Sequence, residues 1–360
     1  MEREPLARER RDLFAETVQK LETAVARRPI SNITIANSYQ TVIADLQTKA
    51  ALFSFALGNY PMVDQYLAQA LPQLEEVNDE MLLGFAYNCW AKASVLRGKR
   101  DLAKKQLLTA HDYATRADDY YIQADALKVL GVVAVDAGDY EAAHARYQES
   151  LAHFRSQGFA PGIAQVLHNI GTVYSRQGEH KLALASYEEA LACAQEARYE
   201  RLVMECLGAI GGTSRTLGNY KKSESHLQKS ITMSRLLGDK RIMASHLKNL
   251  GLTYLAMGDL LRAKKTLKSA LDVSWSTETI PDALSILSAY ASTVAQQGEL
   301  AQALAILLFV QSQEEVRQID LDSYRPMVDD LLTELPDEII AEAKQSAASF
   351  TLAAIVEQLL

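Results

Sequence analysis

Apolar and small residues recur along the chain three, four and seven positions apart, and this pattern itself repeats every forty residues. Spacing of three and four is typical of one face of an amphipathic helix, whereas a half-buried strand would alternate. The repeat is marked by seven glycines at an unbroken interval: Gly58, Gly98, Gly138, Gly178, Gly218, Gly258 and Gly298. A period of this length, held over the whole interval, predicts a stack of equivalent helical units.

Each unit is predicted to consist of two helices that meet at its glycine. The glycine lies where the first helix ends, at a position that often requires a positive φ, and Asp or Asn commonly follows it. One helix pair cannot bury its own apolar face, so neighbouring pairs must stack. The packing register of the unit around Gly178 consists of Leu167, Gly171 and Tyr174 before the glycine and Ala183, Tyr187 and Ala190 after it.

This register resembles the tetratricopeptide repeat, which has a small residue, an aromatic residue and a glycine at these offsets in its first helix. Small, bulky and small residues then follow in the second helix. The resemblance covers roughly residues 40 to 318, but the common unit has about 34 residues, and the closing proline of the family is missing here. The resemblance implies an all-α, right-handed α-solenoid of about seven helix pairs, with longer helices and a wider groove.

The two ends of the chain depart from the repeat. We expect an N-terminal capping helix in residues 1–33, seven helical hairpins in 34–318 and a C-terminal helical cap in 319–360. The cap is predicted to hold two or three shorter helices around Leu335-Pro336. Caps are expected because a terminal repeat would otherwise expose its apolar face. The apolar side of the N-terminal helix, over residues 4–27, comprises Leu6, Leu13, Phe14, Val18, Leu21 and Val25.

Composition favours a soluble, cytoplasmic protein that binds neither nucleic acid nor a membrane. The formal net charge is −8 and the sequence pI is about 5.5, which argues against a polyanion-binding protein. No apolar run approaches the ~20 residues that span a bilayer, and the N-terminus MEREPLARERR is too charged for a secretory signal. Cys89, Cys193 and Cys206 cannot all pair, so reduced, buried thiols are expected.

No catalytic residue, metal site or cofactor is expected. The seven histidines form no HExxH motif or other pair four residues apart. The phosphate-binding motif GxxxxGK[ST] does not occur, since the segment Gly211-Gly212-Thr213-Ser214 lacks the lysine and a preceding strand. A cysteine–histidine dyad that forms only in the folded chain stays open. The sequence therefore indicates a binding protein and not an enzyme.

The C-terminal segment carries a second resemblance. The run LPDEIIAEAKQSAASFTLAAIVEQLL, preceded by LAILLFVQSQEEVRQ, is similar to the tail that closes the repeat arrays of STAND-type bacterial signalling ATPases, including maltotriose-responsive activators and antibiotic regulatory proteins. This implies a sensor module for transcription regulation or other signalling. Such a module binds an inducer, either a small molecule, a peptide or a protein, and controls an ATPase domain of the same full-length protein. The alternative is a stand-alone scaffold that docks a partner protein in its groove.

In the repeat family, the face of the first helices opposite the packing register lines a concave groove. On this face the sequence is polar and mixed in charge, and an inducer or partner is expected to bind there. The candidate ligand-binding residues are Lys128, His168, Asn169, Thr172, Arg176, Gly208, Gly212, Arg215, Lys248 and Asn249.

Two glycines form the most unusual feature of this face. Gly208 and Gly212 lie four residues apart on one helix, although each costs roughly 0.5 to 1 kcal/mol relative to alanine. They are expected to leave a bare floor flanked by Arg176 and Arg215, whose guanidinium groups suit carboxylates or phosphates. The alternative is that the glycines only permit close helix packing and that the arginines are solvated or paired with nearby acids.

Asn169 and Asn249 occupy equivalent places in two units, each just before the apolar residue and glycine of the packing register. In the repeat family, asparagines at this place hold the backbone of an extended peptide, and the resemblance implies that role here. A hydrogen bond between neighbouring helices is the alternative. Both alternatives are open at the level of the sequence.

Overall fold

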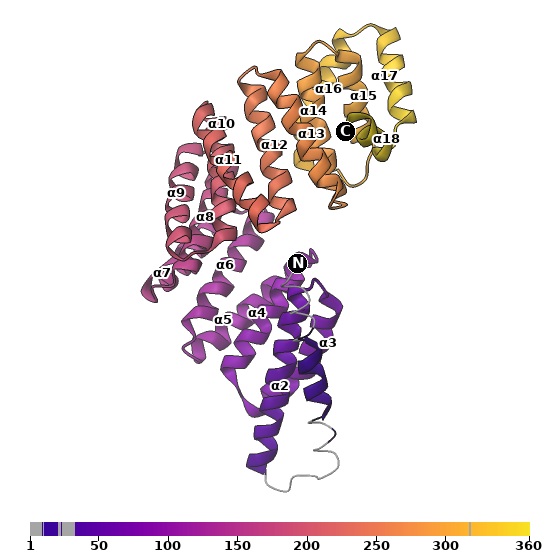
Figure 1. The fold of residues 1–360 in the computed structure, drawn as a ribbon. Helices are drawn as coiled ribbons and strands as arrows, with labels where there is room; N and C mark the ends of the chain where they lie inside the picture. Colours follow the sequence, from indigo (N-terminus) through magenta and orange to yellow (C-terminus); the bar gives the residue numbers. More distant parts are fainter. Residues whose placement is uncertain (1–8, 10, 21–22, 24–32, 317) are drawn as a thin grey trace. The chain divides into compact units, whose positions relative to one another are not determined.

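The computed structural model describes residues 9, 11–20, 23, 33–316 and 318–360, and these residues form helices joined by short turns without any strand. Figure 1 shows the helices in chain order. Their bounds are α2 (Ile33–Ala56), α3 (Tyr60–Val77), α4 (Glu80–Leu96), α5 (Arg100–Arg116), α6 (Tyr120–Asp136), α7 (Tyr140–Ser156), α8 (Ala160–Arg176), α9 (His180–Glu196), α10 (Glu200–Thr216), α11 (Tyr220–Leu237), α12 (Lys240–Ala256), α13 (Leu260–Trp275), α14 (Ile280–Gln296), α15 (Leu300–Gln311), α16 (Gln318–Glu334), α17 (Asp337–Ser349) and α18 (Leu352–Leu359).

The chain divides into two compact units, residues 1–173 and 174–360. In the first unit α2 packs on α3, α4 on α5 and α6 on α7, and the successive pairs are joined through α3 with α4 and α5 with α6. In the second unit each helix from α9 to α15 packs on the next one. Each register glycine lies between an even-numbered helix and its successor, as the sequence predicted. Six of these helix pairs pack within one unit: α2 with α3, α4 with α5, α6 with α7, α10 with α11, α12 with α13 and α14 with α15.

The turns explain why the helices end where they do. The seven register glycines all have left-handed backbones, with φ between +70° at Gly58 and +89° at Gly298, as the sequence predicted. The turns that lead from one pair to the next are also left-handed, although only two of these six positions are glycines. A left-handed residue therefore occurs every twenty residues from 58 to 298. The positions not predicted are Asn78, Asp118, Gly158, Arg198, Gly238 and Glu278.

Side-chain caps fix the start of many helices. The residue after a left-handed position is often Asp or Asn, and its side chain accepts a hydrogen bond from the backbone N–H three residues later. Asp119 accepts from Ile122 in this way at 3.0 Å, and Asp239 from Ile242 at the same distance. Such caps satisfy a backbone donor that the helix itself leaves unpaired.

The predicted contact between small and bulky register positions holds the two helices of a pair together. A Cβ atom added to Gly131 would lie 2.4 Å from the ring of Tyr147, so the glycine makes room for the tyrosine. Leu227 fills the same space at Gly211, and Leu267 fills it at Gly251. Gly131, Gly211 and Gly251 are therefore packing residues within the first helices, and their substitution would displace a buried side chain.

Both ends of the array carry additional helical residues. Residues 11–20 are helical, with Val18 buried and Phe14 stacked on Phe53 at a centroid distance of 5.6 Å. Leu13 of the predicted apolar side is exposed, whereas Leu6, Leu21 and Val25 lie outside the described residues. At the C-terminal end α16, α17 and α18 follow α15, and α17 packs directly on it.

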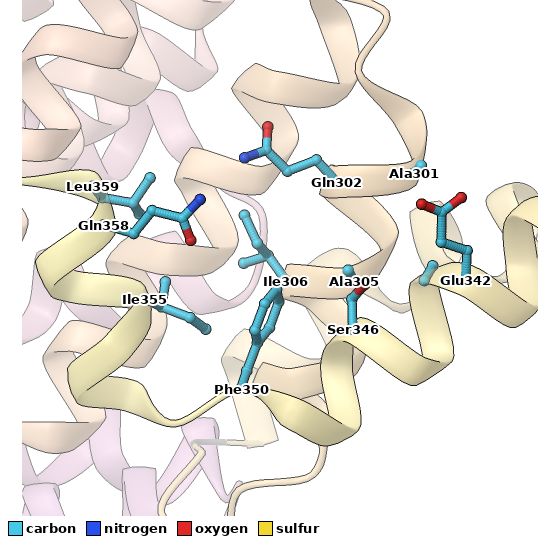
Figure 2. A pocket seen from close by; sticks show the side chains of 11 residues that line it. Ala301, Gln302, Ala305, Ile306, Glu342, Ser346, Phe350, Ile355, Gln358 and Leu359 are labelled. Atoms are coloured by element: carbon cyan, nitrogen blue, oxygen red, sulfur yellow. The ribbon is translucent and has the colours of Figure 1, made fainter.

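The last two helices, α17 and α18, enclose a hollow of about 320 Å³ against α15. Figure 2 shows Ile306 and Phe350 near its middle, with Glu342 at one side and Gln358 at the other. No single described helix is long and apolar enough to cross a membrane; α17 and α18 meet that criterion only when taken together, and they are bent by 105°. Their apolar side chains Ile340, Ile355 and Val356 are buried against the array.

Candidate functional site

A polar contact repeats along the inner face of the first helices. We define the inner face as the residues ten and thirteen positions before each register glycine, with their neighbours, on α4, α6, α8, α10, α12 and α14. In the first unit Asn88 Nδ2 donates to Asp125 Oδ2 at 2.7 Å, and Lys128 Nζ donates to Gln165 Oε1 at 2.7 Å. Both pairs are 37 residues apart and join one first helix to the next. A regular inter-repeat ladder thus occupies part of the predicted groove.

The same contact recurs in the second unit. Lys248 Nζ donates to Ser285 Oγ at 2.8 Å, again across 37 residues. Lys128 and Lys248 were predicted to bind a ligand, but both ammonium groups hold neighbouring repeats together. A ligand would have to compete with these internal partners, so we assign the two lysines first to the stacking of the repeats.

Asp125 is the centre of the most strongly charged cluster on this face. Its side chain is almost fully buried, and it forms ion pairs with Lys92 and with Lys128, whose Nζ lies 2.6 Å from Asp125 Oδ1. Burial works against the carboxylate, but the two ammonium groups prevail and hold its pKa well below the usual range. The same pairing raises the pKa of Lys92 despite its burial. The cluster therefore stays charged at every pH near neutrality.

The predicted bare floor on α10 exists only in part. A Cβ atom at Gly208 would lie 2.0 Å from Nε2 of His246, so the imidazole of α12 fills this position. His246 is buried, and its Nδ1 lies 2.6 Å from Ser230 Oγ. The prediction that Gly208 leaves open floor is therefore wrong at this position, because the residue that covers it comes from the next repeat.

Gly212 and Arg215 differ from Gly208 in that no side chain of the next repeat is shown to cover them. A Cβ atom at Gly212 would meet nothing within 4 Å, so the helix surface there is open. The Nε atom of Arg215 is buried and has no hydrogen-bond partner among the described residues. Burial also lowers the pKa of this guanidinium, which is nevertheless charged at neutral pH. A buried donor without a partner costs free energy that a bound acceptor would recover.

The repeat itself does not require a cation at the place of Arg215. The equivalent positions, three residues before the register glycine, are apolar in α4, α6 and α12, where Val95, Val135 and Leu255 stand. Val135 is buried, and the other two are half-buried. An arginine at a position that otherwise supports packing is thus a feature of this one repeat.

The remaining candidates differ in their surroundings. Asn169 and Asn249 are both half-buried, and neither side-chain amide forms a hydrogen bond to another described residue. Thr172 Oγ1 donates to the backbone carbonyl of His168 at 3.1 Å, which is a local helix contact. Arg176 is exposed at the end of α8. Residues that pair in the ladder are 37 positions apart. Gly212 and Asn249 are separated by the same offset, which places them opposite each other on the adjacent helices α10 and α12.

The described residues contain no cluster of three His, Cys, Asp or Glu side chains that could hold a metal ion. Cys89 and Cys206 are buried free cysteines, as expected, and Cys193 is half-buried. Burial raises the pKa of Cys89 to about 11 and that of Cys206 to about 12. Thiols of this kind are poor nucleophiles because the thiolate is hardly populated.

Sequence reasoning missed three residues of the inner face that the structure shows to be important. Asn88 and Lys92 were not singled out, although they lie in the same register positions as the candidates of later repeats. His246 was treated as one of several scattered histidines. The available signal for Asn88 and Lys92 was the forty-residue register, whereas the contact of His246 with Gly208 depends on the stacking of repeats.

Two family models described as tetratricopeptide repeat match the chain, one over residues 146–196 and 202–274 and the other over residues 248–308. Residues 146–196 and 202–308 carry tetratricopeptide repeats. These matches cover the helices from within α7 to within α15, and the register glycines extend the same spacing to the earlier pairs. No curated protein matches the chain.

Solved structures share the tetratricopeptide-repeat fold at low identity. A STAND protein with a tetratricopeptide repeat sensor from Pyrococcus horikoshii has a TM-score of 0.62 and 14% identity, over 92% of this chain and 55% of that one. A Rap protein complexed with Competence and Sporulation Factor has a TM-score of 0.58 and 14% identity, over 94% and 99%. NprR in complex with its cognate peptide NprX has a TM-score of 0.56 and 14% identity, over 87% and 98%.

Proposed function

We propose that this tetratricopeptide array is a regulatory sensor that binds an acidic or carboxylate-bearing peptide on the inner face of α10 and α12. The observation that carries the proposal is Arg215, whose buried Nε has no partner among the described residues. Gly212, one turn earlier on α10, leaves room for a ligand backbone. Asn249 contributes a half-buried amide on the neighbouring helix, which suits the donor and acceptor groups of a peptide.

Similarity to other repeat proteins supports a peptide as the ligand. NprR and one Rap protein of the same fold were solved with a cognate peptide and with Competence and Sporulation Factor, respectively. A peptide in extended form presents one carbonyl and one N–H at each residue, so a row of polar side chains on successive helices can hold it. The candidates of the first unit, Lys128, His168, Asn169 and Thr172, stay predictions for the same ligand class.

The more specific proposal is that the array controls an ATPase domain of a STAND-type regulator. The C-terminal tail and the likeness to the sensor of the Pyrococcus horikoshii protein support it. The other candidate function is a scaffold that docks a partner protein, which the repeats alone favour equally. An in-frame nucleotide-binding domain encoded beside this chain would favour the sensor, whereas an isolated reading frame would favour the scaffold.

The first experiment selects a ligand without assuming its sequence. The full chain is immobilised and exposed to a synthetic library of random octapeptides with free C-terminal carboxylates, and retained peptides are identified by mass spectrometry. We expect enrichment of acidic or C-terminal carboxylate peptides. Calorimetry with an enriched peptide should then show affinity for Arg215→Met reduced about 10- to 150-fold, because a charge-assisted hydrogen bond contributes roughly 1.5 to 3 kcal/mol.

Two further variants sharpen the result. Gly212→Leu should abolish binding by filling the open surface, and its melting temperature should stay near that of the parent because a Cβ atom at this position meets nothing within 4 Å. Arg176→Met removes an exposed arginine from the end of α8 and serves as the control. Failure of the library to yield any enriched peptide, or equal affinities for the Arg215 and Arg176 variants, would count against the proposal.

A further inference from the structure

The turns at the ends of α5 and α7 lie in the first unit, away from the inner-face residues of α10 and α12. A hollow of about 410 Å³ opens there beside the start of α4. We call it the aromatic pocket and define it by Met81, Asp118, Tyr120, Tyr121, Phe154 and Phe159. Its residues come from three successive repeats of that unit.

Three of the residues that line the aromatic pocket have aromatic rings in contact with one another. Phe154 is buried, and its ring also fills the space over Gly162. Tyr121 and Phe159 stand nearly perpendicular to each other, with centroids 5.4 Å apart and an interplanar angle of 85°. Phe154 lies 5.6 Å from Phe159 and 6.1 Å from Tyr121, so the three rings form one connected cluster.

Three side chains of the aromatic pocket are more exposed than packing requires. Met81 is 57% exposed, Tyr121 48% and Phe159 38%, so a contiguous apolar surface faces solvent. Large adjacent apolar side chains at a protein surface often mark a binding site. The side chains of Met81, Tyr121 and Phe159 are thus partly exposed to solvent in the described structure.

The repeat architecture does not explain why aromatic residues stand at positions 121 and 159 either. The residues equivalent to Tyr121 in α10 and α12 are Arg201 and Arg241, which suit a solvated position. Phe159 stands where α6 and α12 have the capping residues Asp119 and Asp239. Since other repeats fold with charged residues at these places, the aromatic residues are not needed to build the turn.

The charges at the aromatic pocket favour a cation. Asp118 and Asp119 line it, and no lysine or arginine is among its lining residues. Asp119 is engaged as the cap of α6, whereas Asp118 has no ion pair with any described residue. The ammonium group of Lys92 interacts electrostatically with Tyr121 but is bound to Asp125. An incoming cation would therefore meet an unpaired carboxylate and the faces of electron-rich rings.

We propose that the aromatic pocket binds an arginine or lysine side chain of a partner protein. The alkyl stem of such a side chain packs on Met81 and Phe159, while its charged head lies over Tyr121 and near Asp118. Arginine suits the pocket better because its planar guanidinium stacks on aromatic rings and is more weakly hydrated than an ammonium. The pocket thereby adds a second point of contact for a basic segment.

The test uses N-acetyl-arginine methylamide as the probe and the methyl resonance of Met81 in the full chain as the reporter. Titration by NMR should shift the Met81 signal, and the affinity should fall as salt is added. The citrulline analogue, which is neutral and of the same shape, should bind at least about fivefold more weakly. The leucine analogue tests whether the pocket selects charge or only apolar bulk.

Matched variants locate the interaction. Asp118→Asn removes the charge and keeps a residue that tolerates the left-handed backbone, with φ +52° at this position. Tyr121→Leu removes the ring, and both variants should weaken binding of the arginine probe. Glu278→Gln makes the same charge change at an equivalent left-handed turn of the second unit and should leave the titration unchanged.

Three outcomes would overturn the proposal. The Met81 signal could fail to shift up to the solubility limit of the arginine probe, the citrulline or leucine analogue could bind as tightly, or Asp118→Asn and Glu278→Gln could behave alike. None of these outcomes bears on the peptide site at Arg215, which lies in the other unit.

Discussion

At the scale of single residues, His246 shows how a side chain of one repeat completes the packing of the repeat before it. Its ring fills the space over Gly208, and Ser230 is its hydrogen-bond partner. Burial lowers the pKa of His246 to about 4 from an ordinary value of about 6.5. The imidazole is therefore neutral in the folded protein at neutral pH, and protonation is linked to the loss of this packing.

This linkage gives a pH-dependent stability. Between the folded and the unfolded pKa values the unfolded chain binds more protons, so the free energy of unfolding decreases as the pH is lowered through this range. From about pH 7.5 to pH 5, His246 alone should account for a loss of roughly 2 kcal/mol. Urea denaturation at both pH values measures it. His246→Gln should remove most of that difference, whereas His226→Gln, on the neighbouring helix α11, should retain it.

The residue scale also marks a limit of sequence reasoning. Positive φ was predicted at the glycines because only glycine adopts this conformation without steric cost. Nothing in the residue type predicts it at Arg198 or Glu278, where φ is +52° and +54°. There the stacking of successive helix pairs imposes the turn, and the packing energy offsets a cost of roughly 1 to 2 kcal/mol. A tertiary constraint of this kind cannot be predicted from the residues of the turn alone.

At the scale of helices, Asp125 of α6 joins α4 through its ion pair with Lys92 and its hydrogen bond from Asn88. Asp125→Asn would leave Lys92 and Lys128 facing each other without their shared counter-charge. Breaking a buried ion pair costs about 3 to 5 kcal/mol, and we expect roughly 2 to 4 here because the side chain of Lys92 is 32% exposed. Chemical denaturation measures the loss.

Asp136→Asn is the matched control for this helix. Asp136 is exposed at the end of α6, so its substitution should change the free energy of unfolding by less than about 0.5 kcal/mol. Similar losses for the two variants would mean that net charge, and not the buried pairing, determines the effect. An unchanged stability for Asp125→Asn would contradict the assigned role of the ladder.

The helix scale explains why the candidate site could be predicted only in part. Helical periodicity placed Lys128 and Lys248 on the same face of their helices. Their pairing with residues 37 positions away depends on how far one helix pair is displaced from the next, which periodicity does not contain. For the same reason the open surface at Gly212 and the filled one at Gly208 could not be distinguished from the sequence.

At the scale of the whole molecule, the C-terminal cap has a predictable role. Phe350 meets Phe309 of α15 at a centroid distance of 6.2 Å, and Ile340 is buried in the same core. Removal of residues 337–360 would expose the apolar side of α15, so we expect oligomers or aggregates in light scattering after size exclusion. Removal of residues 352–360 alone should produce a milder effect, because α17 would still cover α15. A monodisperse, equally stable chain without α17 and α18 would refute this role.

The forty-residue period allowed the helix pairs to be predicted throughout the described array, because each copy of the pattern supports the others. Periodicity says nothing about a segment that lacks it. The three helices of the cap could therefore be anticipated only in outline, from Pro336 and the apolar runs around it.

The left-handed residue at every twentieth position also limits which insertions and deletions in the gene keep the helices of the array in phase. Between residues 58 and 298 every helix with its turn takes up twenty residues, so a segment can be duplicated or lost there without changing the phase of the later helices. First and second helices differ in the faces they bury, however. An insertion or deletion of twenty residues would place a second helix where the array requires a first helix. Heritable changes in the length of this array are thereby restricted to multiples of forty residues. Joining Gly218 directly to Asp259 would be such a step, since it deletes one whole repeat and leaves a first helix followed by a second.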